Sequence, residues 1–291
     1  MTAGKGRDPV KRKKRIKWTV RVLAAVLLTV WLVLGNSLPG TTEYTVSGKL
    51  PQSFSGFRIA QVSDLHNTSF GENNSRLLTL LENAQPDIIV ITGDMIDSRR
   101  TDIPTALNFA EQAVKIAPCY YVTGNHESRI RRFSELEEGL RLLGVRVLRN
   151  EALILEREGQ TIRLIGMDDC TFFPGENGNQ TVLAMEAALQ KLTGPEYTVL
   201  LSHRPELFWI YWRNDVDLIL SGHAHGGQFR IPFVGGLYAP DQGLFPEYDC
   251  GVYSNGGVTM VVSRGLGNSA FPLRINNPPE LVVVTLTAQT E

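Results

Sequence analysis

Cysteine is scarce in this 291-residue sequence, and its three cysteines lie far apart. Cys119, Cys170 and Cys250 are too few for a disulfide framework, and none of them forms the paired CxxC spacing of a zinc site. No internal repeat or low-complexity tract follows residue 48, and a hydrophobic fraction of 43% is ordinary for a packed core. These features exclude a disordered chain, a coiled coil and a polytopic membrane protein.

A large net charge is also missing, because the formal total is only −1. That total hides an asymmetry, since residues 1–48 carry a net charge of +7 and the remaining residues carry −8. An acidic body argues against nucleic-acid binding, which requires positive charge facing the phosphates. We therefore expect no specific nucleic-acid partner.

The sequence has one long apolar stretch without charged residues, and it lies near the N-terminus. The basic run KRKKRIK (residues 11–17) precedes an uncharged segment from Val22 to Gly35. We expect a basic cytoplasmic tail over residues 1–17 and a transmembrane signal anchor over residues 18–35, because about 17 residues can cross a bilayer. Basic residues beside an apolar segment stay in the cytoplasm, so we expect a single-pass protein of the cell membrane with its body outside the cytoplasm.

Two other interpretations of this stretch stay open. Gly35-Asn36-Ser37 has the small residues of a signal-peptide cleavage site, and the stretch could instead be a buried core helix. A buried helix would leave the basic prefix without a purpose. Residues 36–48 are polar and contain Pro and Gly, so we expect them to be a linker to one catalytic domain over residues 49–291.

Five short apolar runs in the body each stop at a cluster of polar residues. The runs are rich in Ile, Val and Tyr, as in strands buried on both faces. They are Phe57–Val62, Ile88–Ile91, Tyr120–Val122, Val199–Leu201 and Leu218–Leu220. Helical periodicity fills several gaps between them, at residues 77–84, 107–117, 136–143 and 182–192. This alternation predicts an α/β body with ligands beyond the carboxyl ends of the strands.

Further β-rich segments lie later in the chain. Residues 152–156 and 161–166 flank a hairpin turn, and residues 258–263 and 281–286 are late β runs. We expect two sheets packed together with helices outside them.

The polar clusters at the strand ends contain all five histidines of the chain. In order they are Asp64-Leu65-His66, Gly93-Asp94, Gly124-Asn125-His126-Glu127, Ser202-His203 and Gly222-His223-Ala224-His225. Taken singly, each could be a turn or a core histidine, but their recurrence after apolar runs favours one common site. In an extended strand end, Asp64 and His66 would lie on the same side, as would His223 and His225. These donors suffice for two divalent ions, with Mn, Fe, Zn or Co favoured over Mg and Ca by the nitrogen-rich set.

The ordered pattern resembles the calcineurin-like metallophosphoesterase superfamily, whose motifs read D-x-H, GD, GNH[DE], H and GHxH. The match covers residues 57–227 and lacks no ligand position. The strings GHAHGGQFRIP (Gly222–Pro232) and SRGLGNSAFPLRINNPPEL (Ser263–Leu281) resemble the bacterial membrane-anchored branch of YaeI- and YkuE-type phosphodiesterases. The resemblance implies an α/β fold in the form of a four-layer αββα β-sandwich, here behind an N-terminal transmembrane helix.

The resemblance also implies a role for each site residue. Asp64, His66 and His225 would hold one metal ion. Asn125, His203 and His223 would hold the second, and Asp94 would bridge both. His126 would be the catalytic residue that donates to the phosphate or the leaving oxygen, and Glu127, which stands where many members have Asp, would orient His126.

The activity expected from this site is hydrolysis of a phosphodiester or pyrophosphate bond by a hydroxide that bridges the two ions. The tether favours a phospholipid or nucleotide-linked lipid as substrate, because it holds the body near lipid head groups. The same metal core serves phosphomonoesterases and protein phosphatases, so these activities remain an alternative. A non-catalytic metal-binding scaffold is a weaker one. Asp97, Arg99 and Arg100 are expected in a solvated loop.

Overall fold

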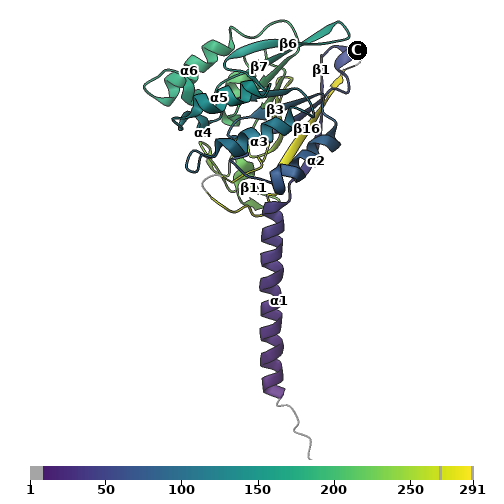
Figure 1. The fold of residues 1–291 in the computed structure, drawn as a ribbon, viewed down its shortest axis with the longest axis vertical. Helices are drawn as coiled ribbons and strands as arrows, with labels where there is room; N and C mark the ends of the chain where they lie inside the picture. The colour runs from purple at the N-terminus through teal and green to yellow at the C-terminus, as the bar shows by residue number, and fades with distance from the viewer. Residues whose placement is uncertain (1–8, 269–270, 290–291) are drawn as a thin grey trace, which may run out of the picture.

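Two six-stranded sheets form the centre of the protein in the computed structural model, which describes residues 9–268 and 271–289 (Figure 1). The first sheet has the order β1-β16-β2-β3-β4-β5 and the second β14-β15-β9-β8-β7-β6. The first contains β1 (Gly40–Gly48), β2 (Arg58–Val62), β3 (Ile88–Thr92), β4 (Cys119–Val122), β5 (Arg146–Val147) and β16 (Glu280–Ala288). The second contains β6 (Glu151–Arg157), β7 (Gln160–Gly166), β8 (Thr198–Leu201), β9 (Leu218–Ser221), β14 (Gly251–Asn255) and β15 (Val258–Val262).

Helices and two small hairpins complete the described chain. The α-helices are α1 (Pro9–Ser37), α2 (Ser75–Ala84), α3 (Ile103–Ala113), α4 (Asn125–Ser128), α5 (Phe133–Leu142), α6 (Gly178–Leu189) and α7 (Phe208–Tyr211). Short 3-10 helices are η1 (Gln52–Phe54), η2 (Glu72–Asn74), η3 (Cys170–Phe172), η4 (Pro205–Leu207) and η5 (His225–Gly227). Strand β10 (Arg230–Ile231) pairs with β11 (Gly235–Gly236), and β12 (Tyr238–Ala239) pairs with β13 (Gly243–Leu244).

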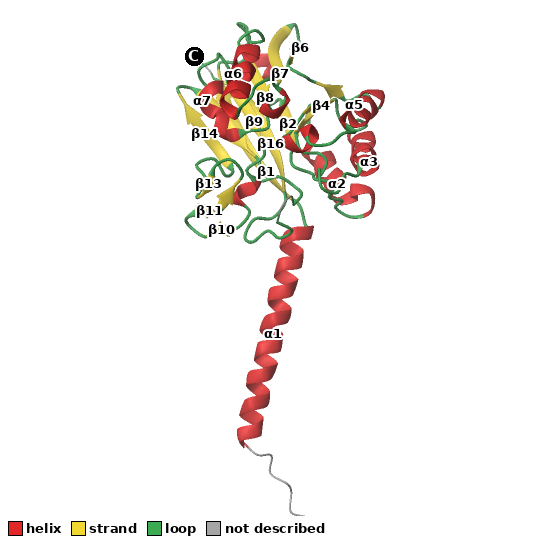
Figure 2. Ribbon diagram, turned by 90° about the vertical axis from the view of Figure 1, so that its left-hand side faces the viewer, coloured by secondary structure: helices red, strands yellow, loops and turns green. Residues whose placement is uncertain are grey.

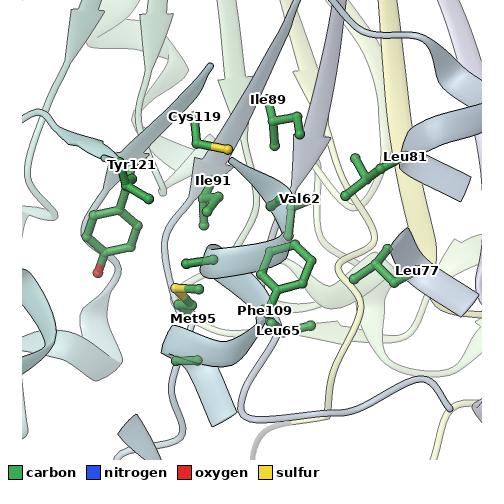
Figure 3. Close-up of a cluster of buried hydrophobic side chains, with 14 of the residues drawn as sticks. Val62, Leu65, Leu77, Leu81, Ile89, Ile91, Met95, Phe109, Cys119 and Tyr121 are labelled. Carbon is green, nitrogen blue, oxygen red and sulfur yellow. The ribbon is translucent and has the colours of Figure 1, made fainter. Parts of the chain in front are cut away.

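Strand β3 shows why the apolar runs are continuous rather than alternating. Its five residues are all buried, and successive side chains point to opposite faces of the sheet. Ile89 and Ile91 pack on the helix side, close to Leu81 and Phe109, in the cluster drawn in Figure 3. Val90 points the other way, into the space between the two sheets. Each central strand must therefore be apolar on both faces.

Three hydrophobic clusters give the order of the layers. One joins the first sheet to α2, α3 and α5, the second lies between the two sheets, and the third joins the second sheet to α6 and α7. Figure 2 shows the helices on the two outer sides of the paired sheets. This order confirms the expected four-layer αββα sandwich.

The structure differs from the sequence-based expectation at residues 36–48. Instead of a linker, the helix α1 runs to Ser37, and residues 40–48 form β1, which pairs in parallel with β16 along its whole length. Tyr44 and Val46 point into the cluster between the sheets. Their spacing of two is the pattern of an edge strand with one buried face, which the Pro and Gly at its start obscure in the sequence.

The helix α1 projects from the body as a single rod (Figure 1). Its segment Lys13–Ser37 is long and apolar enough to cross a membrane, and none of the apolar window is buried against the described body. The interpretation as a buried core helix is therefore wrong. Residues 9–17 of the expected basic tail begin this helix, and residues 1–8 lie outside the described residues.

Candidate metal centre

The five polar clusters meet beyond the carboxyl ends of β2, β3, β4, β8 and β9. Within each sheet these strands run in parallel, so the clusters that follow them lie at the same end of that sheet. All the expected metal ligands are brought together, and none is more than 5% exposed. They are Asp64, His66, Asp94, Asn125, His203, His223 and His225.

The first group of donors is Asp64, His66 and His225. Nε2 of His66 lies 3.3 Å from Nε2 of His225. Nε2 of His225 in turn lies 3.6 Å from Oδ1 of Asp64. One ligand atom from each residue fits within 4.8 Å of the others, which is close enough for a single ion.

The second group is Asp94, His203 and His223, with Asn125 beside it. Nε2 of His203 lies 3.2 Å from Nδ1 of His223 and 3.4 Å from Oδ2 of Asp94. The same Asp94 oxygen lies 3.6 Å from Nε2 of His66 in the first group. Asp94 therefore stands between the two groups, within reach of both.

The backbone that aims these side chains is turned, not extended. Asp64, His66, Asp94, His223 and His225 all have φ between 46° and 64°. The alternation expected of extended strand ends is therefore wrong, and left-handed turns bring each Asp or His inward instead. Such conformations cost roughly 1–3 kcal/mol each in non-glycine residues, and they gather where a function requires them.

Glycines permit the close packing of these turns. At Gly222, an added Cβ would lie 1.9 Å from Oγ of Ser63 and 2.4 Å from Oδ2 of Asp64. The backbone N–H of His223 donates to both carboxylate oxygens of Asp64, each at 3.1 Å. The glycine thus allows the turn after β9 to lie directly against the carboxylate from the turn after β2.

His126 lies next to both groups and has a defined tautomer. Its Nδ1 accepts a hydrogen bond from the backbone N–H of Ser98 at 3.0 Å. Burial lowers the pKa of His126 to about 4, so the ring is neutral at pH 7. A neutral ring with an accepting Nδ1 carries its proton on Nε2, which lies 4.0 Å from Oδ2 of Asp94. The N–H therefore faces the metal groups.

The carboxylate of Glu127 has partners other than the one expected from its orienting role. Its carboxylate accepts backbone N–H groups of Gly124 and Asp94 on one oxygen and those of Met95 and Ile96 on the other. Glu127 therefore holds the turn after β3 against the turn after β4. His126 is oriented instead by Ser98, with Asp97 3.6 Å from its Nδ1. Asp97 is buried, which differs from the solvated loop expected there.

Comparison with known proteins supports this geometry. Residues 57–227, more than half of the chain, match the calcineurin-like phosphoesterase family. This chain belongs to that family. The YkuE metallophosphoesterase of Bacillus subtilis, itself uncharacterised, is 32% identical over 84% of this chain and 85% of its own length.

Other members of the calcineurin-like phosphoesterase family carry more specific names. The phosphodiesterase YaeI of Escherichia coli is 28% identical over 79% of this chain and 82% of its own length. A zebrafish transmembrane protein with a metallophosphoesterase domain is 29% identical over 91% of this chain, which spans 61% of that relative. The solved structure of TT1561 from Thermus thermophilus covers 73% of this chain and 91% of its own, with a TM-score of 0.51 at 13% identity, and this likeness shows the fold alone.

Phosphoesterases of this family use divalent metal ions, and the charges of the site fit such ions. Although burial favours the neutral acid, His203 and His66 hold the pKa of Asp94 well below its usual range. Burial works to lower the pKa of His203, yet Asp94 and Asp64 raise it to about 10. Two buried carboxylates thus require positive charge between them, and the cluster of imidazoles can share that charge with bound cations.

The amide of Asn125 lies beside the second group. In the orientation that satisfies both of its ends, the amide nitrogen donates to Nδ1 of His223 at 2.9 Å, and the amide oxygen accepts from the guanidinium of Arg129 at 3.2 and 3.3 Å. Asn125 is therefore within reach of the second group of donors.

Two residues that adjoin the site could not be assigned from the sequence motifs. Oδ2 of Asp241 lies 3.0 Å from Nε2 of His223 and 2.6 Å from Nη1 of Arg204, so it orients the imidazole from outside. Arg274 is buried, with Nη2 3.4 Å from Nδ1 of His225. Arg274 belongs to the segment Ser263–Leu281, whose resemblance to the membrane-anchored branch could have pointed to it. Asp241 belongs to none of the motifs, so they could not have identified it.

Proposed function

We propose that this phosphoesterase is a phosphodiesterase that cleaves a phosphodiester or pyrophosphate bond with two divalent ions. One observation carries the proposal: two groups of donors share Asp94, and the N–H of His126 faces both of them. When bound, the two ions would supply an activated water for attack on phosphorus and would neutralise the phosphate charge. Metal analysis of the purified protein would determine which of Mn, Fe, Zn and Co it binds.

In this proposal the residues of the chain divide the work. Asp64, His66 and His225 hold one ion, Asn125, His203 and His223 hold the other, and Asp94 contacts both. His126 donates the hydrogen of its Nε2 to a phosphate oxygen or to the leaving oxygen, as a neutral imidazole. The resemblance implies this assignment, and the distances given above support it; each group draws on strand ends of both sheets.

Replacing the shared carboxylate tests the proposal. Asp94→Asn should reduce turnover of bis(p-nitrophenyl) phosphate by about 10³-fold or more, because the amide removes the charge common to both ions. Metal content is measured on the same samples, and Asp215→Asn, at an exposed turn, is the matched control. Near-normal hydrolysis by Asp94→Asn at equal metal loading would overturn the mechanism.

Two alternative functions can be separated by the same assay. A phosphomonoesterase or protein phosphatase would prefer p-nitrophenyl phosphate or a phosphopeptide over the diester. The name of the Escherichia coli relative, a phosphodiesterase, favours the diester. A metal-loaded protein that hydrolyses neither substrate would instead support a non-catalytic scaffold.

We also propose that the chain is a single-pass protein of the cell membrane with its N-terminus in the cytoplasm. The support is the apolar helix α1, the basic residues before it, and relatives named as transmembrane proteins. Alkaline phosphatase fused after residue 291 should be active outside the cytoplasm. Mass spectrometry of the intact chain should find residues 1–36 still attached, which distinguishes an anchor from a cleaved signal peptide.

A further inference from the structure

An apolar hollow, called here the apolar pocket, lies directly beside the metal centre. It has a volume of about 430 Å³ and is lined by Phe229, Leu237, Tyr238, Pro240, Leu244 and Phe271, with His225 at one wall. His225 also belongs to the first group of metal donors. A group bound at the metal centre and a group bound in the apolar pocket would therefore be neighbours.

The apolar pocket lies at the end of the body where α1 joins it. Asn36, near the end of α1, accepts a hydrogen bond from the backbone N–H of Arg274 at 2.7 Å and donates to its carbonyl at 3.0 Å. The same segment carries Phe271, whose ring meets that of Phe229 at 5.0 Å. In Figures 1 and 2, β11 lies at the end of the body from which α1 projects. The apolar pocket therefore lies at the end of the body that would face the bilayer.

Large apolar side chains are also exposed on the two small hairpins that follow η5. On the two small hairpins, Ile231, Phe233 and Val234 are exposed beside β10 and β11, and Leu244 and Phe245 are exposed at β13. Several large exposed apolar side chains on two successive hairpins are unusual on a face that water covers, and they are typical of a surface that contacts lipid. Its position beside α1 explains the exposure, because the helix would hold these hairpins at the bilayer surface.

The apolar pocket presents few polar groups to a ligand. Besides His225, the polar side chains among the described residues that line it are those of Gln228 and Tyr238. Nε2 of Gln228 already donates to the carbonyls of Phe271 and Leu273, at 3.0 and 2.7 Å. The lining thus suits a hydrocarbon chain, since it is mostly apolar and burial of apolar surface is favourable.

We propose that the apolar pocket binds the alkyl chain of a membrane lipid whose phosphate ester occupies the metal centre. The proposal rests on the phosphoesterase function above and names its substrate class as a lipid phosphodiester drawn from the adjacent leaflet. The ester lies at the metal donors, and the chain extends from it past His225 toward Phe229 and Phe271.

Two soluble diesters with the same leaving group test the proposal. The full chain in lipid nanodiscs is assayed with p-nitrophenyl ethyl phosphate and p-nitrophenyl octyl phosphate, at concentrations below micelle formation. Each methylene that becomes fully buried should improve binding about fourfold. The octyl ester should therefore have a kcat/KM at least about tenfold higher than the ethyl ester, chiefly through a lower KM.

A charge in the pocket separates chain binding from partition into the nanodisc. Leu244→Glu should remove the octyl preference, so that the ratio of kcat/KM for the octyl and ethyl esters falls to near one. Leu142→Glu is the matched control, because Leu142 on α5 is also an exposed leucine, 82% exposed against 67% for Leu244. This control should keep the full preference, since the octyl ester reaches the same nanodisc.

Each other outcome has a distinct meaning. If the wild type hydrolyses neither ester when loaded with metal, the phosphodiesterase function fails. If it hydrolyses both equally, the function stands and the chain-binding site is refuted. An octyl preference that survives Leu244→Glu, or a Leu244→Glu variant that dissociates a dimer of this chain, would likewise overturn the proposal, the latter by showing that the apolar surface is a subunit interface.

Discussion

Ser98 determines how His126 can act. Its backbone N–H occupies Nδ1 of His126, and burial lowers the pKa of the ring to about 4. A second proton would have to displace that hydrogen bond, so over the neutral range the ring donates from Nε2 alone. His126 thus contributes a directed hydrogen bond to the substrate and does not need to be an imidazolium.

Removing this donor should slow the reaction without emptying the site. His126→Ala should lower kcat for bis(p-nitrophenyl) phosphate by about 10²–10³-fold, because it deletes one oriented donor to developing charge. Metal content should be unchanged. Ser98→Ala keeps the backbone N–H and loses only the hydroxyl 3.1 Å from Nδ1, so its kcat should fall by less than about threefold. Equal losses in the two variants would argue against the tautomer assigned to His126.

At the scale of elements, the turn after β9 should be intolerant of a side chain. Gly222→Ala would place a methyl group against Ser63 and Asp64, which are both buried in the turn directly after β2. We expect loss of bound metal and a lower melting temperature. Gly178→Ala, at the start of α6 where an added Cβ meets nothing within 4 Å, should change neither quantity. Metal analysis and thermal unfolding measure both effects, and full metal occupancy in Gly222→Ala would contradict this account of the turn.

The sequence predicted the central elements because local pattern and burial agree there. Strands such as β3 are apolar on both faces, and helices such as α2 keep one apolar stripe, so each is visible from its own residues. The strand β1 was missed because an edge strand is only half buried and its pairing partner, β16, lies more than 200 residues later. The strand order was likewise hidden, since it depends on such distant pairings.

The residues of the metal centre also fall into those that the sequence could identify and those that it could not. The metal donors could be identified because chemistry fixes their residue types, which then recur in order along the chain. The role of Glu127 could not, because its hydrogen-bond partners are four backbone N–H groups of two different turns. The left-handed turns at Asp64 and His223 were also missed, since an Asp or His at positive φ leaves no mark in composition.

For the whole molecule, the boundary between anchor and body can be located by truncation. A chain beginning at Leu38 keeps β1 and should be soluble, folded and as active on bis(p-nitrophenyl) phosphate as the full chain. It loses the two hydrogen bonds of Asn36 to Arg274 and the one that Arg76 donates to the carbonyl of Ser37, each worth about 0.5–1.5 kcal/mol, a modest change for the body. Size-exclusion chromatography, thermal unfolding and the diester assay measure the result.

A chain beginning at Lys49 tests whether residues 36–48 act as a spacer or as part of the sheet. It lacks β1, so the paired edge of β16 would face solvent, and the side chains of Tyr44 and Val46 would no longer cover the cluster between the sheets. We expect aggregation, or a melting temperature many degrees lower, and little activity. A flexible linker could be removed without these effects, so a stable and active chain from Lys49 would show that β1 contributes nothing to the fold of the catalytic body.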